Sequence, residues 1–318
     1  MRYVLHIGAI AAVLASMGLL LLPADWTPRQ WLAATQGTAS PTSDRVNAGL
    51  KTALDKGEKY LADSFVELAR QEKLALDPAL RQRYDSETGG IVGSAQELVR
   101  GIWEGKCTST TAFVGTQIGN GLSFGDMRDL YDQAANFRNG RDTDALVIGL
   151  AAVGILSTAA PPFHAATSVI KGLAKANRLS PLLRRELTDA LAVGFDAQAV
   201  LKAVPQLSWW DSLPSIGWES WRPDLSWPLV TEKLPQLVGA VSSGVQLGNL
   251  GTFNQLAGNV VSLISNAGIC GAQDALTLAQ GSADLERLTR LAEQRKGATA
   301  AILKLQGRHA LLSPTGSG

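Results

Sequence analysis

The sequence predicts a mostly α-helical protein: an N-terminal transmembrane or signal-anchor helix, followed by a multi-helix domain with buried apolar, glycine-rich helices. Three observations give this prediction. The chain begins with an apolar run at residues 3–24, and 32 of its residues are glycine. Apolar residues recur at helical spacing from Asp44 to about Leu74. Four stretches contain no Asp, Glu, Lys or Arg, and they are 3–24, 107–125, 145–170 and 234–273.

Residues 1–24 resemble a bacterial export signal. The amino terminus and Arg2 supply positive charge before a run of 22 almost wholly apolar residues. This run is long for a signal-peptide core, and Leu22-Pro23-Ala24 is a poor cleavage site, because small residues are preferred there. An uncleaved anchor is therefore favoured over a cleaved signal peptide. Since positive charge precedes the run, the rest of the chain is expected outside the cytoplasm, in the periplasm.

Composition divides the remainder of the chain into four regions. Residues 25–43 are a linker, since Gly, Ser, Thr and Pro gather at its end. Residues 44–204 are expected to form a helical domain, with the 145–170 stretch at its centre. The Trp- and Pro-rich segment 205–228 follows, and 229–318 is expected to be a C-terminal helical region that packs on 44–204.

The stretch between Asp144 and Lys171 has two interpretations. Its 26 uncharged residues are enough to cross a hydrocarbon core of about 30 Å. However, Pro161-Pro162 divides it, which predicts one helix over 145–160 and a second from about Phe163. A buried helical hairpin in a soluble core is favoured over a membrane span.

Several side chains are expected to mark helix starts. Thr143 or Asp144 caps the first helix of the hairpin. Ser180-Pro181 has the cap-then-proline order of a helix start, and Asp196 starts a shorter helix.

The segment 205–228 carries a concentration of aromatic side chains without a helical or strand period. A loop held across helices by buried indoles competes with a surface that binds a membrane or a protein partner. The candidate interface residues are Trp209, Trp210, Trp218, Trp221 and Trp227.

Four further residues are assigned to packing or cross-linking. Cys107 and Cys270 form a candidate disulfide, because an export signal implies an oxidising compartment. In a reduced compartment they would be small buried hydrophobes. Gly115 and Gly119, four residues apart, are candidate helix-packing positions at which two helices approach closely.

One pentapeptide matches a catalytic motif. Gly121–Gly125 has the G-x-S-x-G pattern of serine hydrolases, with Ser123 as the nucleophile. That motif needs a strand before it, and the sequence shows no alternation of strands and helices. A glycine-rich turn between helices is the favoured interpretation.

Titratable side chains nearby have plain structural interpretations. Asp126, Asp129 and Asp132 are three residues apart and could gather a divalent cation, but acidic residues in the first turns of a helix are the favoured interpretation. His164 is expected to be a satisfied buried or interfacial histidine. No Cys/His spacing typical of zinc occurs.

These patterns limit the function. A net charge of +1 gives no electrostatic reason to expect nucleic acid as a partner. No catalytic set, cofactor site or metal site is predicted. The favoured function is a non-enzymatic, membrane-anchored envelope protein that engages membrane or protein partners. The alternative is a membrane-inserting or pore-forming protein, and a distant alternative is a serine hydrolase that uses Ser123.

Overall fold

A computed structural model of the protein describes residues 41–88, 115–158, 160–207 and 223–311, with the backbone only at 115–124, 161, 223–231 and 247. These residues form helices joined by short loops and contain no β-strand, which confirms the predicted mostly helical class. None of the described helices is both long and apolar enough to span a membrane. The predicted anchor at 1–24 lies outside the described residues.

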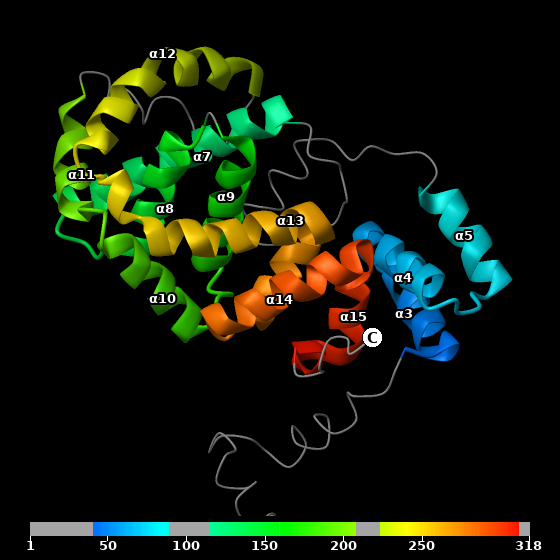
Figure 1. Cartoon of the computed structure of the whole chain (residues 1–318). Helices are drawn as coiled ribbons and strands as arrows, with labels where there is room; N and C mark the ends of the chain where they lie inside the picture. Colours follow the sequence, from blue (N-terminus) through cyan, green and yellow to red (C-terminus); the bar gives the residue numbers. More distant parts are fainter. Residues whose placement is uncertain (1–40, 89–114, 159, 208–222, 312–318) are drawn as a thin grey trace, which may run out of the picture. The chain divides into compact units, whose positions relative to one another are not determined.

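The α-helices, labelled as in Figure 1, are α3 (Ser43–Asp55), α4 (Lys59–Gln71), α5 (Pro78–Thr88), α7 (Gly115–Arg138), α8 (Ala145–Leu156), α9 (Pro161–Lys175), α10 (Pro181–Ala192), α11 (Ala197–Ala203), α12 (Pro223–Ser242), α13 (Gly251–Leu278), α14 (Ser282–Arg295) and α15 (Thr299–Gln306). The short 3-10 helices are η1 (Val204–Gln206), η4 (Leu247–Asn249), η5 (Lys296–Ala298) and η6 (Gly307–Leu311).

The predicted helix starts are confirmed by side-chain caps. At α8, the Asp144 carboxylate accepts the amide protons of Leu146 and Val147 at 3.1 and 3.2 Å. Ser180 caps α10 before Pro181, and Asp196 caps α11. Each cap satisfies a backbone donor that has no partner within its own helix, so the local sequence is enough to place these boundaries.

Two other boundaries differ from the prediction. The helix predicted from Asp44 to about Leu74 is two helices, α3 and α4, because Gly57 between them has a left-handed φ of 67°. Glycine adopts this conformation without steric cost, and it ends α3. Helix α12 begins at Pro223, inside the segment predicted to be irregular. Proline is compatible with a first helical position, because its missing N–H has no helical partner there.

Helix α8 lies between two apolar clusters. One face, with Leu146, Leu150 and Val153, joins a cluster that also includes side chains of α3, α4, α9, α10, α13, α14 and α15. The other face, with Ile148 and Ile155, joins a cluster with α7, α11 and α12. Figure 1 shows α7, α8 and α9 as neighbouring helices, in agreement with their packing contacts. A helix with apolar side chains all round needs protein on every side, and α8 has it.

The 145–170 stretch therefore forms a pair of helices inside the domain. The first helix ends at Leu156, four residues earlier than the predicted 160, and the second begins at Pro161. Every residue from 146 to 155 is buried. This burial agrees with the favoured hairpin interpretation of the stretch.

Two loops beside this pair are joined by backbone hydrogen bonds. The amide of Asp196 donates to the carbonyl of Gly244, and the amide of Gln246 donates to the carbonyl of Gly194, both at 2.8 Å. A Cβ at Gly194 would lie 2.8 Å from the Gln246 carbonyl oxygen. The close approach of these two loops fixes the ends of α10 and α12 relative to each other.

We expect Leu150→Ala to lower the free energy of unfolding by about 2–5 kcal/mol, because it removes a fully buried side chain from α8 and leaves a cavity. Leu182→Ala on α10 is the matched control, since its side chain is 53% exposed and its loss should change stability by about 0.5 kcal/mol or less. Urea unfolding followed by circular dichroism measures both. Equal losses in the two variants would contradict the central position of α8.

Candidate functional site

The most unusual feature of the described domain is a buried group of charged side chains between α7 and α9. Asp126 and Asp129 come from α7, and His164, Lys171 and Lys175 come from α9. We call these five residues the ionic cluster. All but Lys175 are buried. Buried charges are rare in proteins unless they are paired, so each charge in this cluster is expected to have a partner of opposite sign.

Each carboxylate of the ionic cluster is engaged by an ammonium group. Lys171 Nζ donates a hydrogen bond to Asp126 Oδ1 and lies 2.7 Å from Asp129 Oδ2. Lys175 Nζ donates to Asp129 Oδ1. Lys171 thus bridges both carboxylates, whereas Lys175 reaches Asp129 from a position that is partly in water.

His164 completes the cluster at its other end. Its Nε2 atom lies 3.1 Å from Asp126 Oδ2, but outside hydrogen-bonding geometry. Among the described residues, neither imidazole nitrogen has a hydrogen-bond partner. The prediction of a buried histidine is confirmed, but the satisfied hydrogen bonding expected for it is not present in this part of the chain.

Gly154 of α8 makes room for the Asp126 carboxylate. A Cβ at this position would lie 2.2 Å from Asp126 Oδ2 and 2.9 Å from Oδ1. Contacts under about 3 Å do not occur for real Cβ atoms, so only glycine permits the carboxylate to rest against the α8 backbone. The uncharged helix α8 is thereby tied to the position of the charged cluster.

The spacing along α9 explains why one face carries the cluster. Lys171 follows His164 by seven residues and precedes Lys175 by four, so the three side chains share a face of the helix. Asp126 and Asp129 are three apart and share a face of α7. The opposite face of α9 supplies Val169 and Leu173, among others, to the apolar cluster.

Electrostatics hold the charged forms in place. Burial alone would raise the pKa of Asp129, but Lys171 and Lys175 outweigh burial and hold that pKa below its ordinary value. Burial alone would lower the pKa of Lys171, but Asp126 and Asp129 outweigh it and hold that pKa above its ordinary value. Asp129 and Lys171 are therefore charged over the whole physiological range.

The three predicted acidic residues do not act as a set. Asp126, Asp129 and Asp132 lie in the interior of α7 rather than in its first turns, because the helix already begins at Gly115. Asp132 is half exposed and pairs with Arg128 at 3.8 Å, outside the ionic cluster. Across the described ranges, no group of three or more His, Cys, Asp or Glu side chains could hold a metal ion.

The sequence singles out Asp126, Asp129 and His164 but not the two lysines, and Lys171 enters only as the end of an uncharged stretch. Its helical register with His164 and Lys175 marks one charged face of a helix, but that register does not give the acidic partners on α7.

Of the other predicted site residues, those that the structure describes are not part of the ionic cluster. Gly115, Gly119 and Ser123 all lie within α7. The G-x-S-x-G pentapeptide is therefore part of a helix, so the predicted glycine-rich turn between helices is wrong, and the strand-to-helix turn of serine hydrolases is not formed either. Cys270 is buried in the second part of α13. Its candidate partner Cys107 lies outside the described residues, so the disulfide stays a prediction.

Most of the tryptophan segment is likewise outside the described residues. Trp209, Trp210, Trp218 and Trp221 belong to that part of the chain, and Trp227 lies on α12, where only the backbone is described. The candidate interface built on these residues also stays a prediction.

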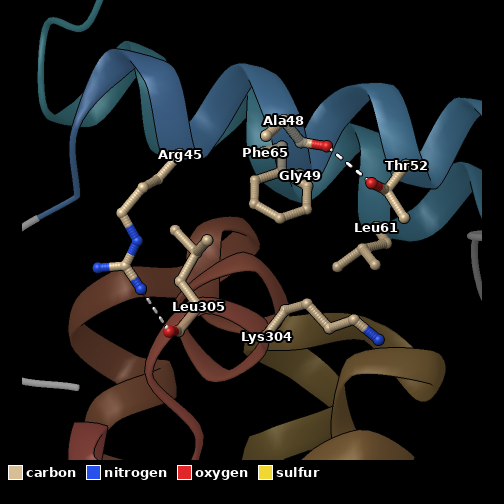
Figure 2. Close-up of a pocket in the computed structure, with 8 residues that line it drawn as sticks. All are labelled: Arg45, Ala48, Gly49, Thr52, Leu61, Phe65, Lys304 and Leu305. Carbon is tan, nitrogen blue, oxygen red and sulfur yellow. Dashed lines mark hydrogen bonds between the residues drawn. The ribbon is translucent and has the colours of Figure 1, made fainter. Parts of the chain in front are cut away.

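A second candidate site is a pocket between α3, α4 and α15 (Figure 2). Its volume is about 330 Å³, at the low end for ligand sites. Arg45 and Lys304 border it, and the Arg45 guanidinium donates to the Leu305 carbonyl at 2.8 Å. However, Leu61 and Phe65 on its floor are at most 1% exposed, so the pocket is a shallow depression over a closed core.

Comparison with known proteins adds no assignment. No family model, no curated protein and no solved structure matches this chain. The interpretation of the ionic cluster therefore depends on its own geometry.

We expect Gly154→Ala to destabilise the protein by about 1–3 kcal/mol, because the new methyl group would displace the Asp126 carboxylate. Gly258→Ala in α13 is the matched control, since a Cβ there meets no atom within 4 Å. That variant should keep or gain stability, by up to about 1 kcal/mol, because alanine favours helix. Thermal unfolding compares the two, and a Gly154 variant as stable as the Gly258 variant would contradict the described contact.

We expect Asp129→Asn to cost about 3–5 kcal/mol near neutral pH, because it leaves the buried Lys171 charge short of a partner. The folded-state pKa of Asp129 is lowered, so its contribution is present above the unfolded value of about 3.9 and is lost as pH falls through the folded value. The difference in the free energy of unfolding between the parent and Asp129→Asn should therefore become smaller below about pH 4.

Urea unfolding of both proteins, from neutral pH to below about pH 4, measures this difference in the free energy of unfolding. Asp132→Asn is the control, because its half-exposed pair with Arg128 should contribute about 0–1 kcal/mol. A pH-independent gap, or an equal loss in the control, would show that Asp129 is not held by the two lysines.

Proposed function

We propose that this protein is a membrane-anchored, non-enzymatic protein of the cell envelope. In this proposal residues 1–24 hold the chain at the membrane, and the helical domain lies in the periplasm and engages membrane or protein partners. The tryptophan-rich segment 205–228 is the proposed contact surface, since clustered indoles suit both membrane interfaces and protein interfaces.

The observation that carries this proposal is the burial of α8. The sequence offers two candidates for membrane attachment, 1–24 and 145–170. In the described domain α7, α9, α10, α11 and α12 pack around α8, and residues 146–155 are all buried. A helix enclosed by protein has no face left for lipid, which supports the proposal that 1–24, and not 145–170, attaches the chain to the membrane.

The closed geometry of the ionic cluster supports the non-enzymatic part of the proposal. Asp126, Asp129, His164 and Lys171 are each at most 4% exposed, and Lys171 occupies both carboxylates. General acid–base catalysis requires a group within hydrogen-bond reach of a substrate. A cluster enclosed between helices with its charges matched suits a structural role.

A second candidate function, a membrane-inserting protein, is favoured by one specific observation. The uncharged helix α8 and its neighbour α9 are joined to α7 by apolar contacts of α8 and by charged contacts of Lys171 and Lys175 at one end of α9. If those contacts opened, an apolar hairpin would be released, which is the material that inserting proteins use.

We expect the full chain to remain in the membrane pellet after extraction with alkaline carbonate, and residues 25–318 alone to be released to the supernatant. A 22-residue apolar helix resists this extraction, whereas a peripheral domain does not. Immunoblotting of both fractions measures the result, with circular dichroism as the control that 25–318 is folded. Retention of 25–318 in the pellet would favour membrane insertion by the helical domain, and release of the full chain would contradict the anchor.

A further inference from the structure

We propose that protonation of His164 opens the contact between α7 and α9, which makes the helical domain responsive to acid. This inference goes beyond the proposed function, because it concerns a change of state within the domain. It holds whether the opened surface then meets a membrane or a protein.

His164 is placed where a gained proton must matter. Its side chain is 1% exposed, and its Nε2 atom faces Asp126 Oδ2 at 3.1 Å. The other oxygen of Asp126 is already engaged by Lys171. Imidazole is the side chain that ordinarily changes charge between about pH 5 and 8, so the cluster contains one group suited to sensing mild acid.

Among the residues that the structure describes, the charged groups around His164 are balanced without that proton. Asp126 and Asp129 face it from α7, and Lys171 and Lys175 lie on its own helix, which gives two negative and two positive charges. Helix α8, on another side of α9, contributes no charged residue.

Helix α13, which also packs on α9, does not change this balance. Its one charged residue is Asp274. The hydroxyl group of Tyr60 on α4 donates a hydrogen bond to Asp274 at 2.7 Å, so that carboxylate is committed elsewhere. Among the described residues, Asp126 is therefore the carboxylate that would have to balance the positive charge of a protonated His164.

A second proton on the ring does not fit this site. A neutral imidazole with its proton on Nε2 carries that proton on the side of Asp126, although the two groups are outside hydrogen-bonding geometry. Protonation then adds an N–H at Nδ1, which has no acceptor among the described residues, and it leaves the cluster with one excess positive charge. A buried donor without an acceptor and an unbalanced buried charge are both unfavourable. Gly154 closes the far side of Asp126, so the carboxylate cannot move away to make a new arrangement.

Opening removes this conflict, because water then solvates the imidazolium. A proton that binds the open state more readily than the closed state shifts the equilibrium toward opening as pH falls. The contact that is lost joins α9 to α7 through Lys171 and Lys175, and its loss loosens the packing of the uncharged helix α8 between them. Acid thus exposes apolar surface that is buried near neutral pH.

The test measures hydrogen exchange of the α8 and α9 amides in the full chain in detergent micelles, at about pH 7.5 and about pH 5, corrected for the intrinsic pH dependence of exchange. In the parent protein the equilibrium constant for opening should increase by up to about tenfold for each unit by which the pH falls, which is the limit for a single proton. His164→Gln should remove this dependence, because glutamine does not gain a proton. His309→Gln in η6 is the matched control and should keep the parent's response.

Three results overturn the proposal: no acid dependence in the parent, the parent's dependence in His164→Gln, or its loss in His309→Gln. If the glutamine variant does not fold near neutral pH, His164→Leu replaces it. The parent itself gives an independent measurement, the titration of ¹⁵N-labelled histidine by NMR. Gain of the second His164 proton should coincide with loss of protection in α8 and α9, and a titration without that loss would also overturn the proposal.

Discussion

The ion pairing of Lys171 with Asp126 and Asp129 is the interaction on which the organisation of the described domain depends. It joins two helices that pack on α8, and Lys171 and Asp126 are 45 positions apart in the chain. Helix α8 has no polar side chain within its ten buried residues. Apolar burial is not directional. The position of α8 between the two apolar clusters therefore depends on charged contacts outside those residues, namely those between its neighbours α7 and α9 and that of its capping residue Asp144 with Arg184 of α10.

Such an arrangement is a compromise between stability and specificity. Taking a carboxylate or an ammonium group out of water costs several kcal/mol, and the attraction between them returns this only when the geometry is good. An apolar replacement of similar shape often matches or exceeds the stability of a buried ion pair. What the ionic cluster adds is register: a shift of α9 by one turn would separate Lys171 from both carboxylates, whereas an apolar interface would tolerate it.

The sequence was informative wherever structure depends on neighbouring residues. Asp144, Ser180 and Asp196 were predicted as helix starts because a cap acts within three residues, and Pro161-Pro162 correctly separated α8 from α9. The break at Gly57 was missed because the apolar spacing continues through it, and only the φ angle shows the turn. Asp126 was expected at a helix start because the glycine-rich residues 121–125 before it were interpreted as a turn, although α7 runs through them.

The ionic cluster itself could not be predicted from one sequence. Each of its members was visible, but nothing local states that an aspartate at 129 meets a lysine at 175. That pairing follows from packing between distant segments, which depends on the whole domain. Burial reversed the ordinary expectation for Lys171, which by composition alone belongs on the surface.

The contact between Gly154 and Asp126 has a consequence for how this protein can diverge. A side chain at 154 displaces the Asp126 carboxylate and therefore favours a smaller residue at 126, such as serine. That exchange removes the carboxylate paired with Lys171, which would then require an uncharged residue at 171 as well. Three positions on three helices should therefore vary together across descendants of this chain. A sequence with alanine at 154 that retains both charged partners would have to build this part of its core differently.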